Sequence, residues 1–98
     1  MQINYNREAE KLTVAPAGRL DTATAPEFEK QLGEILQGVS ELVLDMKKVE
    51  YVSSAGLRVI LKIQKVMHGQ GKMKLTRVNE SIMEILEITG FSDILTIE

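Results

Sequence analysis

Segments typical of strands alternate along this chain with segments of helical periodicity, and this alternation restricts the fold more than any other feature. The apolar run over residues 42–44 and the segment 73–78 have the length and composition of strands. Short alternating segments over 2–6 and 12–15, joined by polar residues, predict a β-hairpin before them. The order strand, strand, helix, strand, helix, strand, helix predicts an α/β fold with a mixed β-sheet of four to five strands flanked by helices.

Three segments have helical periodicity, and each begins near a residue that commonly caps a helix. The first follows Thr24, which has capping-box spacing to Glu27. Ser53 and Ser54 precede the second, and Asn79 precedes the third. Each predicted helix directs apolar side chains inward at helical spacing. These side chains are Phe28, Leu32, Ile35 and Leu36 in the first helix, Leu57, Val59, Ile60, Leu61, Ile63 and Val66 in the second, and Ile82, Ile85 and Leu86 in the third.

The size and charge of the chain argue against several classes of function. With 98 residues, 44% of them hydrophobic, we expect one domain over residues 1–98, and a monomer. A net charge of −2 provides no basic surface for nucleic acid or for an anionic membrane. Without cysteine, and with His68 as the single histidine, the sequence predicts no metal site and no cofactor. No segment resembles a signal peptide or spans a bilayer, so we expect a cytoplasmic protein.

The pair Ser53-Ser54 lies between an extended apolar segment and a strongly apolar helix. A serine in this place commonly caps the helix, because its hydroxyl oxygen accepts a hydrogen bond from a free backbone N–H group. The same free N–H groups and the positive end of the helix dipole favour an anion, so a phosphate on this serine would meet a favourable field. Both interpretations, an ordinary cap and a modified serine, stay open at this point.

Polar residues at the carboxyl ends of the predicted strands define a candidate site. Asp21 follows the second strand, Asp45 ends the third, and Ser54 begins the next helix. Open α/β sheets meet ligands and partners at the carboxyl ends of their strands, so we expect these residues to lie on one edge of the sheet. Taken alone, each aspartate is more typical of a turn or a cap than of a functional site.

The residues near Ser54 do not form a catalytic motif. No G-x-S-x-G sequence surrounds Ser54, and His68 lies near the far end of the same predicted helix, out of hydrogen-bond range. Neither a phosphate-binding loop nor a dinucleotide-binding motif is present. Arg58, Lys62 and Lys65 form a basic ridge on the helix, and its simplest interpretation is a solvated face. We therefore expect no enzymatic activity.

Four segments match a known family in their order and spacing: 18–21 (GRLD), 42–46 (LVLDM), 51–57 (YVSSAGL) and 88–91 (ITGF). In this combination the chain resembles the STAS-domain anti-sigma factor antagonists of bacteria. The resemblance implies a STAS-type domain and a partner-switching function. The unphosphorylated antagonist would bind an anti-sigma factor that is also a serine kinase, and so release the sigma factor. Phosphorylation would abolish this binding, and a PP2C-type phosphatase would restore it.

The same resemblance implies which residues carry the switch. The family motif is Asp-Ser-Ser-Gly or Asp-Ser-Thr-Gly, with the phosphorylated serine two residues before the glycine, so alignment on Gly56 assigns Ser54. Ser53 stands where those proteins have aspartate and is the second candidate, and Ala55 replaces their second hydroxyl residue. The expected partner-binding residues are Asp21, Thr22, Asp45, Ser53, Ser54, Ala55, Gly56, Leu57 and Arg58. The alternative is a STAS adaptor subunit of a transporter or signalling assembly, without a phospho-switch.

Overall fold

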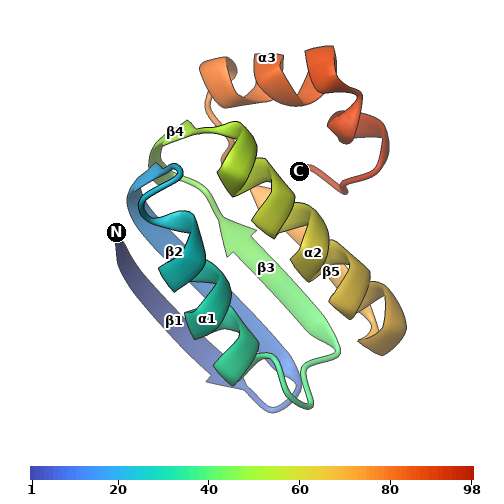
Figure 1. Cartoon of the computed structure of the whole chain (residues 1–98). Helices are drawn as coiled ribbons and strands as arrows, with labels where there is room; N and C mark the ends of the chain where they lie inside the picture. Colours follow the sequence, from blue (N-terminus) through green and yellow to red (C-terminus); the bar gives the residue numbers. More distant parts are fainter.

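The computed structural model describes residues 1–98 and contains five strands, three α-helices and one 3-10 helix (Figure 1). The predicted α/β fold with a mixed sheet flanked by helices is confirmed. One of the five strands, over residues 48–52, is absent from the predicted order of elements. The elements are β1 (Gln2–Glu8), β2 (Lys11–Leu20), α1 (Ala25–Ile35), β3 (Glu41–Asp45), β4 (Lys48–Val52), α2 (Ser54–Gln70), β5 (Lys72–Thr76), α3 (Glu80–Thr89) and η1 (Phe91–Asp93).

Strand β2 organises the sheet because it pairs with three other strands. The predicted hairpin is confirmed: β1 runs antiparallel to β2 along one edge, and β3 and β4 run parallel to it along the other. The first half of β2 pairs with β3 and the second half with β4, so β4 continues the line of β3. Pro16 lies in this interior strand between the two pairings. Strand β5 completes the sheet by pairing with β3.

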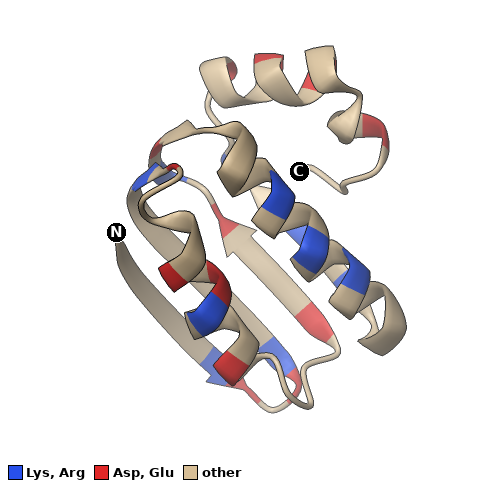
Figure 2. Cartoon of the chain, viewed as in Figure 1, with Lys and Arg blue, Asp and Glu red and all other residues tan.

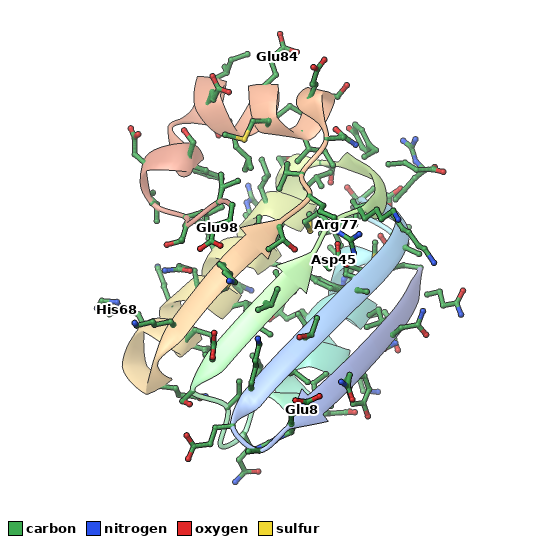
Figure 3. The ribbon with its side chains drawn as sticks, turned by 180° about the vertical axis from the view of Figure 1, so that it is seen from behind. Glu8, Asp45, His68, Arg77, Glu84 and Glu98 are labelled. Carbon is green, nitrogen blue, oxygen red and sulfur yellow. The ribbon has the colours of Figure 1, made fainter.

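Helices α1 and α2 cover one face of the sheet (Figure 1), and the opposite face carries no helix (Figure 3). Alternate residues of a strand point to opposite faces, so one set of strand side chains enters the core. A single cluster of 23 buried residues fills the space between sheet and helices. Its members include Leu12, Val14, Leu42, Leu44, Met73 and Leu75 from the strands, and Phe28, Leu32, Ile60 and Ile63 from the helices.

Helix α3 follows β5 and has the ends that its sequence predicts. Asn79 caps it, since the Asn79 side chain accepts a hydrogen bond from the Ile82 N–H at 2.8 Å. Gly90 ends it in the left-handed conformation, at a φ of 81°. After η1 the chain returns to β5, where Ile97 pairs with Leu75. None of the helices combines the length and the apolar character that crossing a membrane requires.

Candidate functional site

The serine pair lies at the junction between β4 and α2, close to the carboxyl end of β2. The Ser53 N–H group donates to the Leu20 carbonyl at 2.9 Å, which extends the pairing of β4 with β2. The Ser53 hydroxyl accepts a hydrogen bond from the Gly56 N–H at 3.4 Å, and the Ser53 carbonyl accepts one from the Leu57 N–H at 2.9 Å. Ser53 is therefore the N-cap of α2, and Ser54 is its first residue.

The two serine side chains are consequently in different situations. The Ser53 hydroxyl is partly buried and already accepts the capping hydrogen bond. Ser54 is exposed, and its hydroxyl forms no hydrogen bond with the rest of the protein. Of the two serines, Ser54 thus presents its hydroxyl to an incoming protein without giving up an interaction of the fold.

Gly56 allows the first turn of α2 to approach the end of β2 closely. A Cβ atom on Gly56 would lie 2.6 Å from the Leu20 carbonyl oxygen and 2.7 Å from the Leu20 Cγ atom. Both distances are shorter than real Cβ contacts, so a larger residue would push the turn away. Leu57, next along the helix, is buried in the core, and Ala55 is partly buried. The first turn of α2 is thereby fixed against the sheet, with Ser54 on its outer side.

Asp21 lies beside the serine pair, as predicted, because Leu20 and Val52 are paired across β2 and β4. Its carboxylate accepts hydrogen bonds from the N–H groups of Ala23 at 3.0 Å and Thr24 at 3.1 Å. The N–H group of Thr24 is the main cause that lowers the pKa of Asp21 below its usual value.

The capping box that we predicted from Thr24 to Glu27 is wrong. The Thr24 hydroxyl donates to the Arg19 carbonyl at 2.7 Å and accepts from the Asp21 N–H at 2.9 Å, so it makes no cap to α1. Asp21 instead satisfies the N–H groups of the turn that leads into the helix. Thr22, which we expected to contact a partner, is exposed in this turn.

Arg19 and Tyr51 border the same region, and the sequence alone did not predict that these two residues are paired. They are cross-strand neighbours on β2 and β4, and the Arg19 guanidinium lies 4.4 Å from the centroid of the Tyr51 ring. The Arg19 Nε atom is also 3.7 Å from the Asp21 carboxylate. Their pairing depends on the register of two strands distant in sequence, so only the GRLD segment itself could have drawn attention to Arg19.

Asp45 does not lie with Asp21 and Ser54, and this part of the predicted site is wrong. Leu44 pairs with Val14, whereas Val52 pairs with Leu20, six residues further along β2. At about 3.3 Å per residue, these six residues of β2 separate the end of β3, with Asp45, from the end of β4 by roughly 20 Å.

Asp45 has a different partner at the end of β3. It forms an ion pair with Arg77 on the helix-free face of the sheet, where both side chains are labelled in Figure 3. The hydrogen bond from Arg77 is the main reason that the pKa of Asp45 is lowered.

The predicted basic ridge lies along the outer side of α2 (Figure 2). Arg58, Lys62 and Lys65 are all exposed, in agreement with a solvated face. Lys62 pairs with Glu29 of α1 at 3.4 Å, whereas neither Arg58 nor Lys65 takes part in an ion pair. The first turn of α2 contains no acidic residue.

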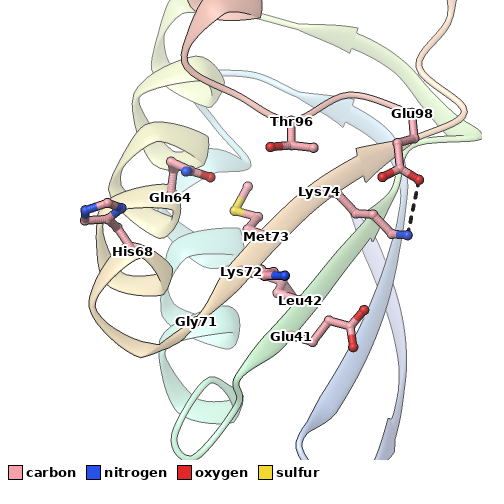
Figure 4. A pocket seen from close by; sticks show the side chains of 10 residues that line it. All are labelled: Glu41, Leu42, Gln64, His68, Gly71, Lys72, Met73, Lys74, Thr96 and Glu98. Carbon is pink, nitrogen blue, oxygen red and sulfur yellow. Dashed lines mark hydrogen bonds and ion pairs between the residues drawn. The ribbon is translucent and has the colours of Figure 1, made fainter.

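A cavity of about 410 Å³ lies far from the serines, between α2, β5 and the C-terminal residues (Figure 4). His68 on its border comes 14 residues after Ser54, which places the two about 21 Å apart along the helix. No three His, Cys, Asp or Glu side chains come together as a metal ion would require. The serine pair with Asp21, Arg19 and Arg58 therefore remains the candidate site.

Comparison with known proteins identifies the family. The STAS domain model matches residues 2–98. BtrV of Bordetella bronchiseptica, which is named as a candidate anti-sigma factor antagonist, is 30% identical over 99 residues, covering 99% of this chain and 85% of BtrV. The anti-sigma-B factor antagonist of Listeria monocytogenes is 30% identical over 95 residues, covering 94% of this chain and 82% of that protein.

Solved structures show the same fold. A candidate anti-sigma factor antagonist from Thermotoga maritima superposes with a TM-score of 0.90 at 24% identity, covering 97% of this chain and 84% of that one. The anti-sigma factor antagonist SpoIIAA has been solved in its unphosphorylated form, with a TM-score of 0.76 at 11% identity, covering 99% and 87%. The phosphorylated form of SpoIIAA superposes with a TM-score of 0.75 at 14% identity, covering 99% of this chain and 91% of that one. Together with the sequence matches, this fold shows that the chain belongs to the STAS-domain family of anti-sigma factor antagonists.

Proposed function

We propose that this protein works by partner switching in the cytoplasm, with Ser54 as the switch. Its unphosphorylated form binds an anti-sigma factor that is also a serine kinase, and so releases the sigma factor. Phosphorylation of Ser54 ends this binding, and a PP2C-type phosphatase restores it. The observation that carries the proposal is the exposed Ser54 hydroxyl, which forms no hydrogen bond on a turn whose cap is supplied by Ser53.

The position of Ser54 suits a modification that changes the surface and leaves the fold intact. A phosphate adds about −1.5 to −2 charges at neutral pH, and the beginning of a helix accommodates negative charge. Since Ser54 is exposed and is not the cap, the phosphate would displace no packed group. The two forms of SpoIIAA, which match this chain almost equally well, are consistent with this expectation.

The proposed partner surface consists of the exposed residues around the first turn of α2. Asp21 and Thr22 border it on the β2 side, and Arg58 borders it on the α2 side. Gly56 and Leu57 are buried, so they contribute by holding the turn in place and do not touch the partner. A new dianion at Ser54, near the Asp21 carboxylate, would oppose a partner surface shaped for a neutral hydroxyl.

The experiment is a pull-down from the host organism with unmodified protein, followed by incubation of the captured kinase with protein and ATP. Intact mass and peptide mapping should locate one phosphate on Ser54. Ser54→Ala should still bind the kinase and resist release, whereas Ser54→Asp should fold and bind poorly. Phosphate on Ser53 with Ser54 unmodified would contradict the assignment. Capture of transporter or signalling subunits without any phosphorylation would favour the adaptor function instead.

A further inference from the structure

We propose that Arg58 is the internal counter-ion of a phosphate on Ser54, so that phosphorylation withdraws the Arg58 guanidinium from the partner surface. The inference rests on the proposed function, because it concerns the phosphorylated state of the same serine. It adds a second effect to the switch. The modification introduces negative charge and also removes an accessible positive charge from the surface beside it.

The positions of the two residues on α2 carry the argument. Ser54 is the first residue of the helix, and Arg58 comes four residues later, so both lie on the same side, with Cβ atoms about 6 Å apart. Long helical side chains lean toward the N-terminus of their helix and cover the preceding turn. From position 58 the guanidinium is long enough, in this preferred direction, to reach back over the turn that carries Ser54. Both side chains are exposed, so neither must leave a packed position to form the pair.

Arg58 is also available for this interaction. The four ion pairs of the protein use Arg19, Lys62, Lys74 and Arg77, and none uses Arg58. No acidic residue occurs in the first turn of α2 to compete for the guanidinium.

The other charged groups near the serine pair are already engaged. The Asp21 carboxylate is held by backbone N–H groups and by Arg19, whose guanidinium also stacks on Tyr51. One turn beyond Arg58 lies Lys62, a like charge that pairs with Glu29 across the groove to α1. Like charges four residues apart on a helix repel each other weakly, which further favours the orientation of Arg58 toward Ser54. Arg58 is thus the one cation beside Ser54 without an ion pair.

Guanidinium and phosphate have matching geometry. Two N–H groups of the planar fork donate to two phosphate oxygens, and such charge-assisted pairs are shorter and stronger than neutral hydrogen bonds. In the unmodified protein the same fork is free to bind a carboxylate of a partner. Phosphorylation offers Arg58 an anion that is tethered to the same helix and therefore present at high effective concentration. A carboxylate of the partner would have to displace this phosphate to bind Arg58.

The test uses protein with phosphoserine incorporated biosynthetically at position 54, so that no kinase is needed. Phosphorus NMR then measures the second pKa of the phosphate in three phosphorylated proteins. These are the chain without further substitution, the Arg58→Ala variant, and the Lys65→Ala variant as the matched control. Lys65 is also exposed and free of ion pairs, but it lies about 16 Å from Ser54 along the helix. We expect the phosphate pKa to rise by about 0.3 units or more in Arg58→Ala and to stay unchanged in Lys65→Ala.

Two further measurements make the outcome specific. Arg58→Lys should recover part of the pKa difference, because it keeps the charge and loses the bidentate fork. High salt should reduce the difference between the unchanged chain and Arg58→Ala, as expected for an exposed pair. Equal phosphate pKa values with and without the Arg58 guanidinium at low salt would overturn the inference. A kinase that fails to modify Ser54 would contradict the proposed function and would leave this measurement unaffected.

Discussion

Replacing Gly56 by alanine should destabilise the protein, although alanine is the better helix former. The added methyl group would lie 2.6 Å from the Leu20 carbonyl oxygen, so the start of α2 or the end of β2 must move by several tenths of an ångström. Overpacking of this kind costs about 1–3 kcal/mol, and helix propensity returns up to about 1 kcal/mol. We expect a net loss of about 1–2 kcal/mol, or a melting temperature lower by about 4–16 °C for a domain of this size.

Gly69→Ala is the matched control for this prediction, since it makes the same change in the same helix. No atom lies within 4 Å of the Cβ position at Gly69, so only the gain in helix propensity remains, and stability should rise by up to about 1 kcal/mol. Thermal and urea denaturation of both variants measure the difference. A Gly56→Ala protein as stable as Gly69→Ala would refute the close approach of α2 to β2 and the fixed position of Ser54 that depends on it.

The serine pair and the Asp45 ion pair yield further predictions. Ser53→Ala should lower the free energy of unfolding by about 1 kcal/mol through loss of the cap, while Ser54→Ala should change it by less than about 0.5 kcal/mol. Urea denaturation measures both values. A larger loss in Ser54→Ala than in Ser53→Ala would exclude Ser53 as the cap. Asp45→Asn should destabilise at pH 7, because Arg77 lowers the pKa of Asp45. A carboxyl group whose pKa is lower in the folded than in the unfolded protein stabilises the fold at pH values above its unfolded pKa, which is about 3.9 for aspartate. This stabilisation disappears as the pH falls through the pKa of the folded protein. The two proteins should therefore converge below about pH 4, and a constant difference down to pH 2 would contradict this cause.

The sequence predicted the elements whose ends are marked by local chemistry. Helix α3 begins at the expected cap Asn79 and ends at Gly90, because capping and the left-handed conformation depend on a few adjacent residues. The apolar periodicity of α2 and its beginning at the serine pair were equally readable. At the beginning of α1, the local sequence could not show which side chain satisfies the free N–H groups. Thr24 had the spacing of a capping residue, but its hydroxyl bonds to the Arg19 carbonyl, and Asp21 satisfies the N–H groups of the turn.

The composition of the site could be predicted only in part, because it depends on which strands pair. Asp21 and Ser54 lie near each other because β4 pairs with the second half of β2. Asp45 is excluded for the same reason, since β4 extends the sheet beyond the end of β3. The polar residues of β4 gave only a weak strand signal, so the extension was not foreseen. Cross-strand register likewise produced the contact of Arg19 with Tyr51, which no spacing in the sequence reveals.

The attachment of Ser53 to the end of β2 would restrict how the proposed kinase recognises this protein. The Ser53 N–H group donates a hydrogen bond to the Leu20 carbonyl, and the close approach of Gly56 to Leu20 fixes the first turn of α2. A kinase that modifies Ser54 must accept a folded helical turn, since an extended substrate would require this junction to unfold. A short peptide with the same residues forms little helix in water, so the peptide should be a poor substrate. Recognition would then report on the folded state of the domain as well as on its sequence.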